Sequence, residues 1–379
     1  MREKRILVIS PDFPPPLLGG SLVYLHNLIE NSELNFTVFT DVKNRKNSKK
    51  ISYNESRFIK NSSSPKKFQL LLMYIYFLLN LYKIQKFEKV ILNISAIGNG
   101  FFCYILSKLG VKVLILAFAE EITLSLNTKG FKGVIKRYCL KGYKKSNAII
   151  SVSNFAKKIL IEKLNVKSQI TVIPTPVHNS KFSNINTEEK KTSEVFRILS
   201  VGRLIKRKGF DHLLKTIKII LDKNYKIKLT IIGSGPEKDF LIKYISQNSL
   251  TQFVNIFSDA SDEFLVSQYK TNDLFVLANL MLENGDCEGA PNVLIEAAAF
   301  GMPSIAGKEG GTSDVVDHNN TGILLDPRDN IYFANKIIEL IQDKEKLKQL
   351  GIKAYKKANN FHKKEIAAKN FSDVIISLK

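Results

Sequence analysis

The sequence has few of the residues that cross-link domains or bind metal ions. It contains only three cysteines in 379 residues, Cys103, Cys139 and Cys287, and their spacing shows no pairs. A disulfide framework and a structural zinc site are therefore not expected, and a reducing cytoplasm is the natural compartment. None of the five histidines has neighbours suited to metal ligation, and we expect no bound metal ion.

Long apolar runs are also scarce. The run that begins at Ile6 is too short for a signal peptide and is typical of a buried first strand. The stretch Phe68–Tyr82 has about 15 residues, fewer than the roughly 18 to 20 needed to span a bilayer. It follows the basic segment Lys43–Lys67. It is therefore either a helix buried against the first sheet or an amphipathic helix at a membrane interface.

Acidic residues are scarce in one half of the chain. The net charge is +22, and residues 1–178 hold 28 Lys and Arg against 10 Asp and Glu. The remaining residues hold 29 against 25, which is close to balance. Such a basic half suits nucleic acid or an anionic membrane. Because no recognisable nucleic-acid module accompanies the charge, we expect a membrane partner, contacted through Lys43–Lys67 and Lys129–Lys145, and no nucleic acid.

Short apolar runs alternate with helical patterns along both halves of the chain. This alternation predicts an α/β fold with two doubly wound parallel sheets that face a cleft. The predicted strands are Arg5–Ser10, Thr37–Thr40, Lys89–Ile94, Val111–Ala117 and Ala148–Val152, then Arg197–Gly202, Lys228–Gly233, Val254–Phe257, Leu274–Leu277, Pro303–Ala306 and Gly322–Leu325. The helices predicted in the first half are Leu22–Asn31, Pro65–Phe87, Phe101–Leu109, Gly130–Lys145 and Asn154–Leu164, the last capped by Ser153. The polar stretch Asn179–Ser193 is predicted to link the domains.

The segment from Glu288 to Pro303 combines two carboxylates with a helix start. Gly289 and Pro291 predict a loop, and the following residues to Phe300 are good helix formers. Glu288 then precedes the helix, whereas Glu296 lies about one turn inside it. A helix N-terminus favours a phosphate, and flanking carboxylates suit the hydroxyls of a sugar and a ribose.

Two further segments suit phosphate. Arg203 and Lys208 follow a predicted strand, where two cations five residues apart can hold a diphosphate. Their neighbours Lys206 and Arg207 are expected to be solvated. Gly19-Gly20 precedes a predicted helix and permits a close backbone approach to a ligand. Gly233 opens a comparable turn that we place near the nucleotide.

With these motifs the sequence resembles the retaining nucleotide-sugar glycosyltransferases of family 4, of the bacterial surface-polysaccharide type, which have the GT-B fold. The resemblance covers most of the chain and rests on the order and spacing of several segments. They are Ile6 to Gly20, Val201 to Gly209, Glu288-Gly289-Ala290-Pro291-Asn292 with Glu296, Gly301-Met302-Pro303, Gly310 to Val316 and Thr321 to Leu325.

The resemblance implies two Rossmann-like domains, residues 1–185 for the acceptor and 186–357 for the donor, with a C-terminal helix at about 358–379 returning to the first. It also implies that Arg203 and Lys208 neutralise the diphosphate in place of a metal, that Glu288 orients the donor sugar and that Glu296 binds the ribose. The implied donor-binding residues are Gly19, Gly20, Arg203, Lys208, Gly233, Gly289, Ala290, Pro291, Asn292 and Glu296, with Glu288, Arg203 and Lys208 as the catalytic set.

The sequence departs from the family pattern on the acceptor side. Many members carry a histidine after the strand that here ends at Ala117, and this chain has none there. Glu120 or Glu121 is either an acceptor contact or a loop acid that caps the next turn. Asp314 stands where a glutamate is more usual, which is a conservative change.

The sequence therefore predicts a retaining, metal-independent glycosyltransferase without a cofactor, peripheral on the inner face of the plasma membrane. Its donor is a nucleotide sugar, linked to UDP or GDP, and its acceptor is a lipid-linked or growing surface glycan, as in capsule or lipopolysaccharide synthesis. Two alternatives stay open. A GT-B nucleotide-sugar epimerase would need no acceptor, and a non-catalytic basic binding protein would bind nucleic acid in a salt-sensitive way.

Overall fold

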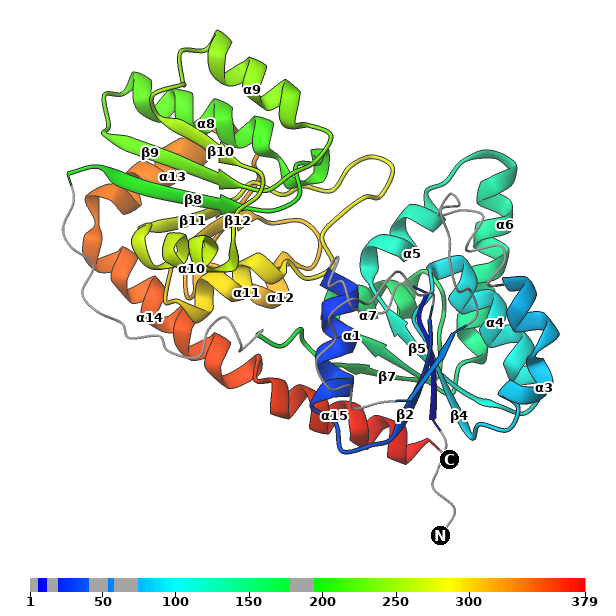
Figure 1. Ribbon diagram of the computed structural model, residues 1–379. Coiled ribbons are helices and arrows are strands. Elements are labelled where there is room, and N and C mark those ends of the chain that lie inside the picture. The colour runs from blue at the N-terminus through cyan, green and yellow to red at the C-terminus, as the bar shows by residue number, and fades with distance from the viewer. Residues whose placement is uncertain (1–5, 12–19, 41–53, 58–73, 178–193, 379) are drawn as a thin grey trace. The chain divides into compact units, whose positions relative to one another are not determined.

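The computed structural model describes residues 6–11, 20–40, 54–57, 74–177 and 194–378. The chain divides into two compact units. One unit runs to Pro176 and includes the C-terminal residues from Lys364, and the other is Val177–Lys363. Each unit contains one parallel sheet, and helices cover both faces of that sheet (Figure 1). Among the described residues, no helix has both the length and the apolar content needed to cross a bilayer.

The first unit is built on a seven-stranded sheet in the order β3-β2-β1-β4-β5-β6-β7, and every pairing is parallel. The interior strands are apolar, as expected for strands covered on both faces. The strands are β1 (Ile6–Ile9), β2 (Phe36–Thr40), β3 (Asn54–Arg57), β4 (Lys89–Leu92), β5 (Lys112–Ala117), β6 (Ala148–Ser151) and β7 (Gln169–Val172).

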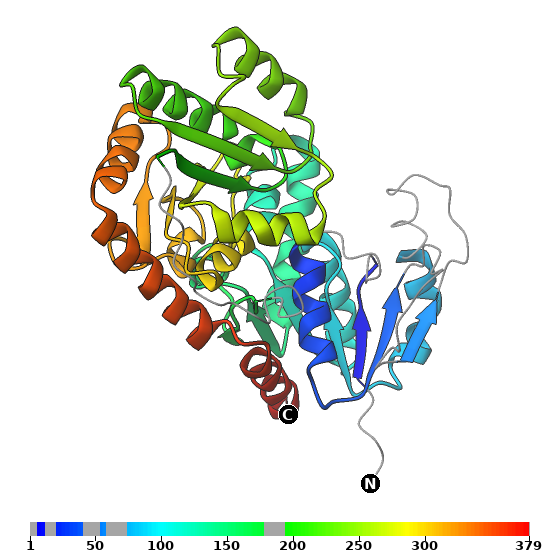
Figure 2. The same cartoon turned by 60° about the vertical axis from the view of Figure 1, so that its left-hand side comes forward.

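Helices alternate with these strands, and the C-terminal helix joins them. The helices are α1 (Gly20–Glu30), α3 (Leu81–Ile84), α4 (Ala96–Lys108), α5 (Ala119–Leu126), α6 (Gly130–Leu140), the 3-10 helix η1 (Lys141–Lys145), α7 (Asn154–Glu162) and α15 (Lys364–Ser377). Helix α15 packs against α1 (Figure 2). Phe371 of α15 stacks on Phe36 of β2. The last residues of the chain are therefore part of the first unit's core.

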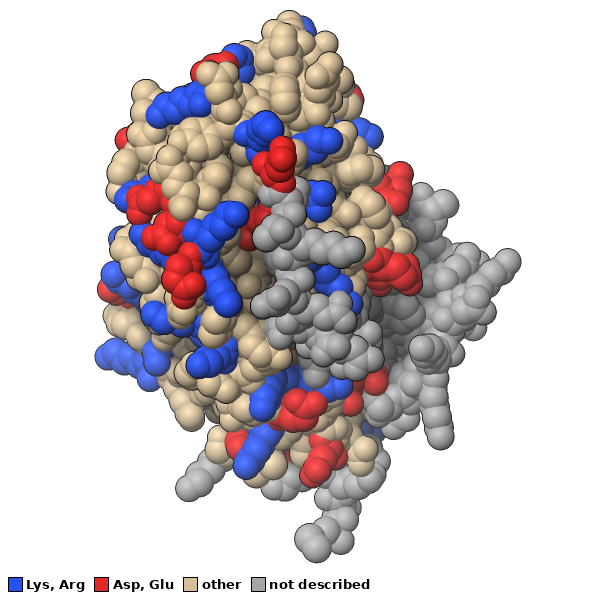
Figure 3. All heavy atoms as spheres, turned by 90° about the vertical axis from the view of Figure 1, so that its left-hand side faces the viewer, with Lys and Arg blue, Asp and Glu red and all other residues tan. Residues whose placement is uncertain are grey.

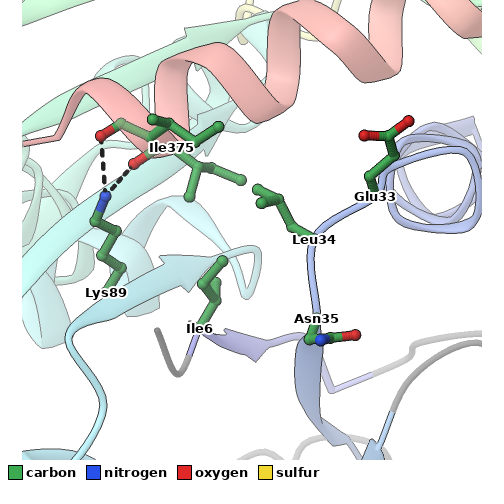
Figure 4. Close-up of a pocket in the computed structure, with 7 residues that line it drawn as sticks. Ile6, Glu33, Leu34, Asn35, Lys89 and Ile375 are labelled. Carbon is green, nitrogen blue, oxygen red and sulfur yellow. Dashed lines mark hydrogen bonds between the residues drawn. The ribbon is translucent and has the colours of Figure 1, made fainter. Parts of the chain in front are cut away.

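A buried lysine ties α15 to the sheet. Lys89 begins β4, and its ammonium group donates to the carbonyl oxygens of Ile375 and Ile376 in the last turn of α15 (Figure 4). These carbonyls belong to the negative end of the helix, which a cation stabilises. The cavity beside Lys89 measures about 180 Å³ and is lined by the first residues of β1 and β4. It lies at the N-terminal edge of the sheet, opposite the edge where parallel sheets bind ligands.

The second unit has a six-stranded parallel sheet in the order β10-β9-β8-β11-β12-β13. Its strands are β8 (Phe196–Val201), β9 (Ile227–Ile232), β10 (Val254–Phe257), β11 (Leu274–Leu277), β12 (Ser304–Gly307) and β13 (Gly322–Leu325). Its helices are η3 (Lys206–Lys208), α8 (Phe210–Asp222), α9 (Lys238–Gln247), α10 (Asp262–Thr271), α11 (Asn292–Ala299), α12 (Thr312–Val315), α13 (Asn330–Gln342) and α14 (Lys344–Phe361). Two buried apolar clusters, both including strand residues, form its core.

The two doubly wound sheets confirm the fold class predicted from the alternating pattern. Ser153 caps α7 as expected, because its hydroxyl accepts from the amide of Ala156 at 3.2 Å. The prediction missed the edge strands β3 and β7 and the helix α5. The predicted linker Asn179–Ser193 and the start of the predicted helix Pro65–Phe87 lie outside the described residues. Within the latter helix Phe77 is buried, whereas Leu79 and Tyr82 are exposed.

Candidate functional site in the second unit

The strand order of the second sheet brings two loops together. β8 and β11 are neighbours in the sheet. The strand that follows β8 in sequence, β9, lies on one side of this pair, and the strand that follows β11, β12, lies on the other. Loops that follow the carboxyl ends of such strands diverge and open a crevice in which doubly wound sheets bind ligands. The loop after β8 carries Arg203 to Lys208, and the loop after β11 carries Glu288. The fold thus places the predicted cations and the predicted carboxylate at one sheet edge.

The loop after β8 has a shape that requires glycine. Gly209 adopts a left-handed φ of 65°, and a Cβ atom there would lie 1.8 Å from the carbonyl oxygen of Ala278, just after β11. The amide of Leu280 also donates to the carbonyl oxygen of Arg207 at 2.9 Å. The two loops are therefore in backbone contact.

Their side chains form a chain of four charges. Glu288 accepts from Arg207 Nε at 2.7 Å with one carboxylate oxygen and from Lys208 Nζ at 3.0 Å with the other. Arg207 Nη1 also donates to Asp286 at 2.7 Å. The side chain of Glu288 is 9% exposed and that of Lys208 is 10% exposed. We name this group the 207/288 cluster: Arg207, Lys208, Asp286 and Glu288.

The expectation that Arg207 is solvated is wrong. Its side chain is only 16% exposed and joins two carboxylates of the loop after β11. A fork of guanidinium donors can bind two acceptors at once, whereas the point charge of a lysine cannot match that geometry. Lys206 beside it is exposed, as expected.

The cluster keeps Glu288 ionised. Burial alone would raise the pKa of its carboxyl, but the charges and hydrogen bonds of Lys208 and Arg207 outweigh burial and hold the pKa below its usual value. A buried carboxylate that stays negative can accept hydrogen bonds from hydroxyl groups at neutral pH.

The backbone of Glu288 is held by the loop after β12. The amide of Gly311 donates to the carbonyl oxygen of Glu288 at 2.8 Å. Gly310 has a φ of 73°, and a Cβ atom there would lie 2.4 Å from that same oxygen. Three consecutive loops of the sheet edge therefore converge on one residue.

Helix α11 begins four residues after Glu288 and carries Glu296 in its second turn. Pro291 precedes its first residue, Asn292, and between Glu288 and Pro291 the half-buried Gly289 and Ala290 complete the loop as predicted. Tyr269 of α10 donates its hydroxyl to Glu296 Oε2 at 2.8 Å. The ring of Tyr269 stacks on Phe300 with an interplanar angle of 7°. Burial raises the pKa of Tyr269, so the phenol stays protonated and fixes the orientation of Glu296.

Two other predicted donor residues lie at the same edge. Arg203 directly follows Gly202 at the end of β8 and is exposed. Gly233 follows β9 with a φ of 154°, and a Cβ atom there would lie 1.9 Å from the carbonyl oxygen of Gly202. The turn after β9 can therefore approach the loop after β8 only because residue 233 is glycine.

Figure 3, which looks at the left-hand side of Figure 1, shows basic and acidic side chains interspersed on that face.

The predicted residues of the first unit are placed as follows. Gly19 lies outside the described residues, and Gly20 is the first residue of α1. Glu120 and Glu121 lie in the first turn of α5, directly after β5. Glu121 Oε1 accepts from the hydroxyl of Tyr143 at 3.3 Å and caps the amide of Phe118 at 3.5 Å. Asn99 in turn donates to the Tyr143 hydroxyl at 3.4 Å.

These surroundings make Glu121 sensitive to pH. Burial raises the pKa of its carboxyl to about 8, with a smaller contribution from Glu120, against the lowering effect of its two hydrogen bonds. The folded state therefore holds a proton that the unfolded chain releases above its ordinary pKa of 4.5. The free energy of unfolding is therefore expected to fall as pH rises from about 4.5 to about 8.

Glu121→Gln should remove this dependence, because the amide cannot ionise. Chemical unfolding should give the variant and the wild type similar midpoints at pH 5 and a higher midpoint for the variant at pH 8.5. Glu162→Gln, an exposed change on α7, is the matched control and should follow the wild type. A parallel pH response of the Glu121→Gln protein and the wild type would contradict the assignment.

The second unit is similar in sequence to glycosyltransferases. A family model described as "Glycosyl transferases group 1" matches residues 181–357, which include the 207/288 cluster and Glu296. The capsular polysaccharide biosynthesis glycosyltransferase CapM of Staphylococcus aureus is 30% identical over 228 residues, 56% of this chain and 57% of CapM. The chain spans about half the length of the first curated relatives it matches.

Solved structures resemble the whole chain. Sucrose-phosphate synthase from Thermosynechococcus elongatus aligns with a TM-score of 0.78 and 18% identity over 99% of each chain. HepE of Anabaena, solved in complex with UDP, aligns with a TM-score of 0.73 and 14% identity over 98% of this chain and 100% of HepE. At such identities the likeness concerns the fold. Residues 181–357 thus match the model of group 1 glycosyl transferases, and the chain that carries them has the GT-B fold of two Rossmann-like units.

Proposed function

We propose that this protein is a retaining glycosyltransferase that moves a sugar from a nucleotide diphosphate sugar to a hydroxyl group of a lipid-linked or growing surface glycan. The observation that carries the proposal is the 207/288 cluster, which places two cations and an ionised carboxylate at the ligand-binding edge of a doubly wound sheet. The family match and the likeness to CapM support the reaction class and point to polysaccharide synthesis.

In the proposed reaction the bond between the anomeric carbon and the diphosphate oxygen breaks, and the nucleoside diphosphate leaves with the electron pair. A new bond forms from the acceptor oxygen to the anomeric carbon, and the hydroxyl proton is released. Lys208 and Arg203 stabilise the negative charge that grows on the leaving diphosphate, the role that a metal ion has in other transferases. Glu288 accepts hydrogen bonds from the sugar and Glu296 from the ribose.

Donor binding then requires an exchange of partners. Lys208 contacts Glu288 in the structure, whereas the proposed function needs its charge on the diphosphate. Arg207 lowers the electrostatic cost of this exchange, because it still neutralises the Glu288 carboxylate when the Lys208 ammonium group turns to the phosphate. Asp286 holds Arg207 from its other side at 2.7 Å and keeps it in place. Glu288 thus stays ionised in both states.

A transfer assay identifies whether the donor nucleotide is UDP or GDP. The purified protein is incubated with a panel of UDP- and GDP-linked sugars, with and without a glycan-lipid acceptor extract, and the products are analysed by mass spectrometry. We expect the matching nucleoside diphosphate to raise the melting temperature, and transfer to appear only when the acceptor is present. An altered free nucleotide sugar without acceptor would instead indicate an epimerase. Absence of nucleotide binding combined with salt-sensitive binding to nucleic acid would overturn the proposal.

We also propose that the protein acts at the inner face of the plasma membrane. A lipid-linked acceptor resides there, and the strongly basic first 178 residues suit its anionic surface.

A further inference from the structure

Helix α6 of the first unit presents its apolar stripe outward. Phe131, Val134, Ile135 and Tyr138 follow the i, i+3, i+4, i+7 spacing of one helix face, and they are 80%, 56%, 45% and 70% exposed. In a surface helix of a globular protein this stripe normally faces the core. Here it faces away from it.

The opposite side of α6 is the side that packs. At about 100° per residue, Gly133 and Leu140 lie about 180° from the centre of the stripe, and these are the buried residues of α6. The helix packs against α4 (Figure 1), and a Cβ atom at Gly100 of α4 would lie 2.0 Å from the carbonyl oxygen of Cys139. This close approach leaves no room to turn the stripe inward. The outward orientation is therefore built into the packing.

Basic residues flank the stripe on both sides. The same spacing places Lys132 along one flank, and Arg137 and Lys141 along the other. Lys136 lies nearer the packed side, where its ammonium group donates to Thr128 Oγ1 at 3.0 Å. Lys141 also lies over the ring of Tyr138, with its ammonium nitrogen 5.5 Å from the ring centroid. The segment 129–145 holds seven basic residues and no acidic one. An apolar stripe between two basic flanks is the pattern of a helix that lies in a membrane interface.

From this geometry we infer that α6 is the surface through which the protein docks on an anionic lipid bilayer. The aromatic and branched side chains enter the boundary between head groups and acyl chains, while the flanking cations contact lipid phosphates. A second copy of the chain fits less well, because its segment 129–145 brings the same seven positive charges. Nucleic acid would match the charge but would leave Val134 and Ile135 exposed to water.

The inference rests on the proposed membrane association and assigns it a surface; it does not depend on sugar transfer. Within that surface Phe131 and Val134 are exposed, so replacing them with glutamine should leave the fold intact. The matched control is Ile331→Gln with Phe361→Gln, two exposed apolar residues of the second unit that are both 64% exposed.

The test is co-sedimentation of the full chain with vesicles of phosphatidylcholine alone or mixed equally with phosphatidylglycerol. We expect the wild type and the control to bind the mixed vesicles and to bind pure phosphatidylcholine weakly. Phe131→Gln with Val134→Gln should lower the partition coefficient about tenfold or more, and Lys132→Glu with Lys141→Glu should lower it by a similar factor. Circular dichroism and transfer to a soluble acceptor should be unchanged in both variants.

Several results would overturn the inference. Wild-type-like vesicle binding by the glutamine variant would show that the stripe does not enter the bilayer and that charge elsewhere suffices. Failure of the wild type to bind anionic vesicles would contradict both the surface and the membrane association. Loss of single-stranded RNA binding in the glutamine variant, with vesicle binding intact, would assign the face to nucleic acid. Vesicle binding as expected but no use of any nucleotide sugar would contradict only the proposed function.

Discussion

Replacing Lys208 with methionine should lower the rate of sugar transfer by about 10² to 10³, the usual loss when one group that stabilises transition-state charge is removed. Methionine keeps much of the apolar length of the side chain, and Arg207 still holds Glu288 at 2.7 Å. The loops should therefore stay in place. We expect the nucleoside diphosphate to bind more weakly as well, because its phosphates lose a buried cation. Steady-state kinetics and titration calorimetry with the preferred diphosphate measure the two effects.

The neighbouring residue supplies the control for this experiment. Lys206 is two positions away, carries the same charge and is exposed. Lys206→Met should change the transfer rate and the dissociation constant by less than about twofold, since a solvated charge is screened. Equal effects of the two substitutions would show that overall charge, rather than the position of Lys208, governs the reaction.

Much of the second unit could be predicted from sequence because its strands are short apolar runs between polar segments. β10, β11 and β13 have the predicted bounds, and the other strands of that sheet differ by a residue at their ends. The edge strand β3 of the first unit lacks this signal. β3 is Asn-Glu-Ser-Arg and has no apolar pattern. It is defined by its pairing with β2, its neighbour in the sheet.

Helix α5 was missed for a different reason. It begins two residues after β5 ends, and the prediction read Glu120 and Glu121 as either acceptor contacts or loop acids. In the structure Glu121 accepts a hydrogen bond from the amide of Phe118 and so caps the start of the helix. The helix can therefore begin directly after the strand. The same contact, and the hydrogen bond from Tyr143, turn the side chain of Glu121 toward its own unit.

The role of Arg207 could not be read from its neighbours in sequence. A run of three cations, Lys206 to Lys208, is typical of a solvated loop, and its partners Asp286 and Glu288 are about 80 residues away. The missing information was the order of the strands. Once β8 and β11 are adjacent, the loops that follow them meet, and a buried carboxylate there needs cationic partners. The alternation of elements predicts two sheets but leaves that order open.

Replacing Arg207 with methionine should make sugar transfer sensitive to acid. In the wild type both Arg207 and Lys208 counter the effect of burial and hold the pKa of Glu288 below its usual value. The activity should then fall only at low pH, where Glu288 gains a proton. Without Arg207, a donor that engages Lys208 leaves Glu288 buried and without its two cations, so its pKa should rise. Because this state exists only with the donor bound, the acid limb of the pH profile of kcat should move up by about one to three pH units.

A charge-conserving variant separates charge from geometry at this position. Arg207→Lys restores one cation but cannot bind Asp286 and Glu288 with a fork of donors, so its acid limb should lie between those of the methionine variant and the wild type. The loss of activity should also be larger at pH 6 than at pH 8 for the methionine variant, because ionised Glu288 is the active form. If the methionine variant were slower by the same factor at every pH, Arg207 would only support the loop. A displaced acid limb would instead show that Arg207 lets Glu288 remain charged while Lys208 binds the diphosphate.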